Sequence, residues 1–133
     1  MCLRAVPKKG REEGVLAGTI TTKRVYDPAE AGDGIRVLVD RLWPRGLRKD
    51  DAHLDHWLRA VAPSTGLRKW FGHDPARWDE FIRRYSEELA GNPALAELED
   101  LVRQGHVTLL YGAHDREHNQ AVALAAYLRS RSG

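Results

Sequence analysis

The sequence contains little cysteine, little excess charge and no long hydrophobic run. Its 133 residues include one cysteine, Cys2, so an intrachain disulfide is excluded and thiol catalysis has no candidate in an ordered basic setting. No apolar stretch is long enough to span a bilayer, and the first residues do not resemble a secretory signal. These absences predict a cytoplasmic protein without a membrane partner.

The charge balance excludes little by itself. Twenty-one Lys and Arg residues against 19 Asp and Glu residues leave a formal net charge of +2, which does not require a polyanionic partner. The hydrophobic content of 42% and the charged content of 30% are typical of a globular protein. Residues 1–17 mix charged residues, proline and glycine without a period and are predicted to be a flexible tail. Residues 18–133 are predicted to form one domain.

Periodicity predicts alternating strands and helices. Residues 19–25, 35–39 and 107–111 are predicted strands, and the last two are nearly continuous apolar runs, as expected for strands covered on both faces. Helical spacing follows the caps and first-turn prolines at 74–75 and 92–93, and a last helix is expected over 116–130 with Asp115 as its cap. Ser64 is a further predicted cap, and residues 54–58 fit either a short helix or a strand. The predicted fold is α/β, a largely parallel sheet with helices packed on its faces.

Two loops that follow predicted strands carry the candidate ligand site. In open α/β sheets, ligands bind beyond the carboxyl ends of the strands. Residues 40–46 place an acid, two guanidinium groups and an aromatic ring directly after a strand. Residues 112–119 place two small residues before a helix whose first amides lack intrahelical partners and are able to hold an anion. If the two strands are neighbours, these loops enclose a basic crevice.

Within the first loop, Arg41 and Arg45 are candidates for holding a phosphate or carboxylate, and Asp40 is a candidate acid or base. Trp43 is a candidate ligand contact, although a tryptophan in this position more often belongs to the core. The alternative is structural: Asp40 and Arg41 then pair with other charges and only hold the loop. The residues alone leave both interpretations open.

The second loop adds His114 and His118 as acid–base candidates, with Asp115 and Asn119 as ligand contacts or helix caps. The spacing of the two histidines is compatible with a metal, but the glutamate and third ligand of specific zinc motifs are absent. No metal and no cofactor is therefore predicted. His73, in an aromatic and basic segment at 67–74, is a further candidate ligand contact.

Four segments resemble one family closely: residues 36–46 with the sequence RVLVDRLWPRG, then residues 62–64, 67–74 and 109–113. They are similar to the YeaO-like branch of the bacterial domain-of-unknown-function family 488, over about residues 19–128. The resemblance implies no particular reaction. The broader family has an Asp-x-Arg-type motif after an early strand and a Cys-His-Arg-type motif after a late one. Here the second motif is Glu117-His118-Asn119, which lacks the cysteine and the arginine.

These observations favour a protein that binds a small anionic or phosphate-bearing molecule, and they leave open whether it is an enzyme. The alternative is a nucleic-acid-binding or regulatory module built on the helices predicted at 75–90 and 93–104. That alternative is weakened because the second helix carries three acidic residues, Glu97, Glu99 and Asp100, against Arg103. The sequence does not predict an oligomeric state.

Overall fold

Four parallel strands form the sheet in this computed structural model, which describes residues 19–132. Across the sheet they are β2 (Ile20–Arg24), β5 (Val107–Tyr111), β3 (Ile35–Leu38) and β4 (His56–Trp57). β5 and β3 lie side by side in the centre of the sheet, and Val107 is in register with both Ile20 and Ile35. Because every pair is parallel, all four carboxyl ends lie at one edge. The predicted α/β fold is confirmed.

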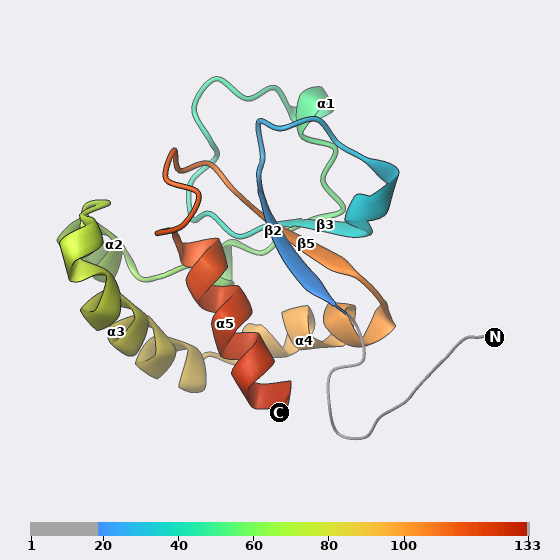
Figure 1. The fold of residues 1–133 in the computed structure, drawn as a ribbon. Helices are drawn as coiled ribbons and strands as arrows, with labels where there is room; N and C mark the ends of the chain where they lie inside the picture. Colours follow the sequence, from blue (N-terminus) through green and yellow to red (C-terminus); the bar gives the residue numbers. More distant parts are fainter. Residues whose placement is uncertain (1–18, 133) are drawn as a thin grey trace.

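Helices connect the strands in the described part of the chain (Figure 1). They are α1 (Lys49–Ala52), α2 (Thr65–Phe71), α3 (Trp78–Ala90), α4 (Leu95–Gln104) and α5 (Gln120–Ser132), with short 3-10 turns at Ala31–Asp33, Arg59–Val61 and Pro75–Arg77. In Figure 1 the long helices α3, α4 and α5 lie in the lower half of the view, whereas α1 lies at the top. The segment of uncertain type at 54–58 contains the short strand β4.

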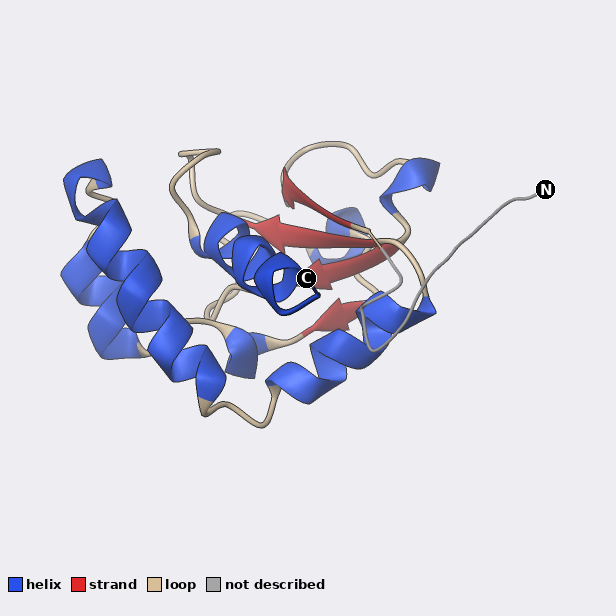
Figure 2. Ribbon diagram, turned by 60° about the horizontal axis from the view of Figure 1, so that its bottom comes forward, coloured by secondary structure: helices blue, strands red, loops and turns tan. Residues whose placement is uncertain are grey.

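The two faces of the sheet have cores of different size. Side chains alternate between the faces along each strand. Val37 and Leu109 join the large core that α2 to α5 complete, whereas Leu38 and Leu110 join a small core with Trp43. Figure 2 shows long helices packed along the sheet. The small core is covered mainly by loop and by α1, so the loop after β3 helps to close the hydrophobic core as well as to line the sheet edge.

Three helix starts were predicted correctly to within a few residues. Ser64 Oγ accepts a hydrogen bond from the Leu67 amide, as expected of a cap. Asp74 accepts from the Ala76 amide, but the cap serves a 3-10 turn, and α3 itself begins at Trp78. The Asn92 side chain likewise accepts from an amide two residues later, before α4.

The predicted start of the last helix was wrong. α5 begins at Gln120, and its cap is Asn119, whose side-chain oxygen accepts from the Val122 amide at 3.0 Å. Asp115 accepts instead from the amides of Glu117 and His118 at 2.9 and 3.0 Å, within a tight turn. Asp115 is therefore the cap of a turn and not of α5. These two hydrogen bonds resemble those of a helix cap, which explains the prediction, but residues 116–119 do not continue as a helix and Asn119 supplies the cap of α5.

Two further predictions concern the chain ends and the membrane. The predicted tail at 1–17 lies outside the described residues. Within residues 19–132, no helix combines the length and the apolar character needed to cross a bilayer.

Candidate functional site

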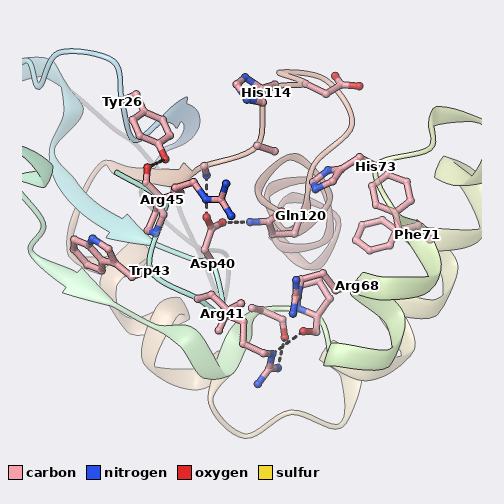
Figure 3. A pocket seen from close by; sticks show the side chains of 18 residues that line it. Tyr26, Asp40, Arg41, Trp43, Arg45, Arg68, Phe71, His73, His114 and Gln120 are labelled. Carbon is pink, nitrogen blue, oxygen red and sulfur yellow. Dashed lines mark hydrogen bonds between the residues drawn. The ribbon is translucent and has the colours of Figure 1, made fainter. Parts of the chain in front are cut away.

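The loops after β3 and β5 line one cavity of about 710 Å³ at the carboxyl edge of the sheet (Figure 3). They meet because β3 and β5 are hydrogen-bonded neighbours. The 18 lining residues come from residues 40–45 and 112–115, from Tyr26 after β2, and from a third wall made by Ala62, Pro63, α2, His73, α3 and the first turn of α5. The predicted crevice required the two strands to be neighbours, and the structure shows that they are and that both loops line the same cavity.

Gly112 allows the two loops to approach closely. A Cβ atom added there would lie 3.0 Å from Asp40 Oδ2 and 3.3 Å from Pro44 Cβ, which is tighter than ordinary van der Waals contact. The Gly112 amide donates to Asp40 Oδ2 at 2.9 Å. A glycine directly after β5 thus lets the backbone bond to the carboxylate that follows β3.

Asp40 is a half-buried acid at the centre of the cavity. Its second carboxylate oxygen, Oδ1, accepts from the Gln120 side-chain amide, and its backbone oxygen accepts from the Trp57 indole. Burial raises the pKa of the Asp40 carboxyl to about 6, and its two hydrogen bonds and the charge of Arg68 reverse only part of that effect. The group is therefore able to exchange a proton close to neutral pH.

Arg41 is held against the cavity wall by backbone oxygens. Its Nε and Nη2 atoms donate to the carbonyls of Pro63 and Ala62, both at 3.0 Å. These acceptors are neutral carbonyls, so they do not offset the positive charge of the guanidinium. The arrangement also ties the loop after β3 to the segment before α2, and Arg41 thus has a structural role whatever it binds.

Arg45 and Arg68 are exposed and line the cavity from different elements. Within residues 19–132, neither guanidinium donates a hydrogen bond to the protein or pairs with a carboxylate. The backbone oxygen of Arg45 accepts from the Tyr26 hydroxyl at 2.5 Å, which anchors the loop and leaves the side chain untouched. Two cationic groups with unused donors therefore border the cavity.

Trp43 and His73 contribute to the site in different ways. The Trp43 indole donates to the Leu47 carbonyl at 2.7 Å and packs edge-on against Trp57, so it is largely engaged in the small core. His73 is exposed, lines the cavity, and has a left-handed backbone with φ of +58°. This backbone conformation is unfavourable for residues other than glycine. His73 lies across the cavity from Arg45 in Figure 3.

The four candidates of the second loop separate into two pairs. His114 and Asp115 line the cavity, whereas His118 and Asn119 are not among its lining residues. His118 Nδ1 lies 2.9 Å from Asp115 Oδ2, and its ring packs edge-on against Trp78. Asn119 is buried as the cap of α5. Amides of Glu117 and His118, with the His118 ring, hold the pKa of Asp115 below its usual value.

Among the polar residues that line this cavity, sequence reasoning missed three: Tyr26, Arg68 and Gln120. Tyr26 follows β2, a strand whose carboxyl end reaches the same edge, so the rule used for the other two loops would have found it. Arg68 and Gln120 lie on helices, and their sequence positions carry no comparable signal. Among the described residues, no group of three or more His, Cys, Asp or Glu side chains is arranged to hold a metal ion.

Fold and cavity together define a class of protein: a small α/β domain whose parallel sheet opens at its carboxyl edge into a cavity rich in arginine. Residues 19–132 match the family model described as "Inactive DUF488-N3 subclade", and the chain belongs to this family. The resemblance to the YeaO-like branch of domain-of-unknown-function family 488 is confirmed.

Two relatives illustrate the similarity. The Uncharacterized protein YeaO of Escherichia coli (strain K12) is 46% identical over 112 residues, which cover 84% of this chain and 97% of the relative. The Uncharacterized protein Rv3073c of Mycobacterium tuberculosis (strain ATCC 25618 / H37Rv) is 45% identical over 112 residues, covering 84% and 95%. No solved structure gave a significant match to the chain.

Proposed function

We propose that this protein binds a small anionic molecule, such as a phosphate ester or a carboxylate, in the cavity at the carboxyl edge of the sheet. The observation that carries the proposal is the pair Arg45 and Arg68, two guanidinium groups that line the cavity without a protein acceptor. Arginine presents several donors in a planar fork that matches the oxygens of phosphate and carboxylate. A bound anion would take up the donors that the fold leaves unused.

The partners of the nearby acids support the same proposal. Asp115 is already hydrogen-bonded to two amides and to His118, so it does not neutralise either arginine. The raised pKa of Asp40, about 6, means that a minority of the population is uncharged near neutral pH, and this share grows as the pH falls. Arg41 adds a third positive charge whose contacts are neutral carbonyls. The cavity therefore favours a negatively charged occupant.

Binding without turnover is the form of the proposal that agrees with the other observations. The family model that matches the chain is described as an inactive subclade. The second motif, Glu117-His118-Asn119, has no cysteine. The ring of His118 contacts Asp115 and Trp78, and His118 does not line the cavity. The alternative of a nucleic-acid partner gains no support from α4, where Glu97 and Asp100 are exposed and Arg103 pairs with Asp100.

The test is anion binding by the full chain and by the variant R45A/R68A, measured by calorimetric titration with inorganic phosphate and with sulfate. Each arginine removed takes away at least one charge-assisted hydrogen bond, so we expect about a tenfold loss of affinity per arginine. The fold should be unaffected because both side chains are exposed and unpaired.

The matched control is R48A, which removes an exposed arginine that neither lines the cavity nor donates a side-chain hydrogen bond within residues 19–132. This variant should bind both anions as the unchanged protein does. Equal affinity of R45A/R68A and the unchanged protein would contradict the proposed site, as would the absence of any binding.

A further inference from the structure

The cavity is much larger than its anion-binding groups require. Small-molecule sites usually enclose about 300–1,000 Å³. This cavity, at about 710 Å³, lies well within that range, whereas an inorganic phosphate or sulfate would fill only a small part of it. The remaining space is large enough for another part of a ligand.

Exposed apolar surface is concentrated at this cavity. Among residues 19–132, the large hydrophobic side chains that remain exposed are Tyr26, at 40%, and Leu42, at 62%, and both line the cavity. They come from different loops, one after β2 and one after β3. Tyr26 is held in place by its hydrogen bond to the Arg45 backbone and by Arg24, whose guanidinium lies 4.8 Å from its ring centroid. Apolar side chains left exposed beside a cavity are typical of ligand contacts.

The interior of the cavity continues this apolar surface. Pro44, Ala62 and Pro63 are buried residues whose side chains border it, and Phe71 and Phe81 reach it from the large core. Phe71 and Phe81 stack on each other with ring centroids 4.3 Å apart, and both are buried, so this part of the wall is held in place by core packing. Apolar side chains that are fixed in place favour a planar ring over a flexible chain, because a ring loses little conformational entropy when it packs against them.

We infer that the ligand of this cavity is an aromatic anion, in which a planar ring packs on the apolar wall and on Leu42 while a phosphate or carboxylate group binds to Arg45 and Arg68. The inference rests on the proposed function and narrows its ligand class. The ring also contacts Asp40 and Gln120 at the centre of the cavity, where a half-buried acid and amide can select polar substituents on the ring.

The experiment compares phenyl phosphate with methyl phosphate, two esters of the same charge that differ in the ring, and with benzyl alcohol, which keeps the ring and lacks the charge. Calorimetric titration of the full chain should give phenyl phosphate an affinity about tenfold or more above that of methyl phosphate, from burial of the ring. Benzyl alcohol should bind far more weakly than phenyl phosphate. The variant L42S should lose most of the preference for phenyl phosphate while its affinity for methyl phosphate stays the same.

Each outcome separates the two proposals. If phenyl and methyl phosphate bind equally well, the aromatic class is wrong and the anion site stands. A preference for phenyl phosphate that persists in L42S would also overturn the inference, because the ring would then bind elsewhere. Benzyl alcohol that binds as tightly as phenyl phosphate, or the absence of binding by both esters, would overturn the anion site as well.

Discussion

The variant R36A is expected to lose about 3 kcal/mol of unfolding free energy, the lower end for breaking a buried ion pair, because a buried carboxylate loses one of its cationic partners and two carbonyls lose their donor. Arg36 lies on the central strand β3 and is only 5% exposed. Its guanidinium pairs with Asp33, which is 7% exposed, and donates to the carbonyls of Ala52 and His53, both at 2.9 Å. Without Arg36, the two carbonyls lose a donor, and Lys23 is the one cationic partner that Asp33 keeps within residues 19–132.

Urea denaturation of R36A and of the control R83A tests this expectation. Arg83 makes two ion pairs, with Glu80 and Glu87, but its side chain is 58% exposed on α3. Exposed pairs contribute little, so R83A should lose much less unfolding free energy than R36A. Equal losses of unfolding free energy in R36A and R83A would show that burial does not determine how much the Arg36 contacts contribute to stability.

The second large effect is expected from Asp40. Burial raises the pKa of this carboxyl from 3.8 to about 6 in the folded protein, so the folded state holds the proton more tightly than the unfolded state does. Stability from this group is present in full below pH 4 and is lost as the pH rises through 6. The shift in the Asp40 pKa corresponds to a loss of up to roughly 3 kcal/mol of unfolding free energy between pH 4 and neutral pH.

The variant D40N cannot ionise and should escape this loss. Its unfolding free energy relative to the unchanged protein should rise by up to roughly 3 kcal/mol between pH 4 and pH 7.5, whatever constant offset the new amide introduces next to Gln120. The exposed aspartate Asp50 outside the cavity supplies the control D50N. Urea denaturation across this pH range provides the measurement, and a difference that does not vary with pH would exclude a raised pKa at Asp40.

The same proton should affect anion binding. A bound anion beside Asp40 disfavours the ionised form of the carboxyl, so the affinity for the anion should increase as the pH falls through 6. If the anion and the carboxylate lie a few ångströms apart in partly exposed surroundings, the increase should be about tenfold or less. Sulfate is the suitable probe because its own charge stays constant over this range. D40N shares every histidine with the unchanged protein, so the comparison isolates the Asp40 carboxyl. The same increase in D40N would assign the effect to other groups.

Arg36 shows where sequence patterns stop being informative. In the sequence it interrupts an apolar run, and the strand around it was still predicted correctly because its neighbours alternate between two buried faces. Its carbonyl acceptors follow it by 16 and 17 residues, in a stretch whose structure the sequence left open. A buried arginine is tolerated only where such acceptors converge, and their convergence is a property of the folded chain.

The candidate site shows the same division. Arg45 and the loop after β3 were found from the sequence because a dense polar motif directly follows a recognisable strand. Arg68 and Gln120 were missed because each faces the cavity from a helix whose orientation depends on packing. His118 lies outside the cavity lining because the turn at Asp115 directs its ring toward Trp78.

The sequence by itself determined the local elements of this protein, because hydrophobic periodicity, glycine, proline and capping residues act over a few positions of the chain. It also determined the family, through motifs that are contiguous in the chain. Only the tertiary structure decided that β5 lies between β2 and β3, and thereby that residues some 70 positions apart, Asp40 and Gly112, form a hydrogen bond. Such contacts depend on the packing free energy of the whole sheet and its helices, which no local pattern contains.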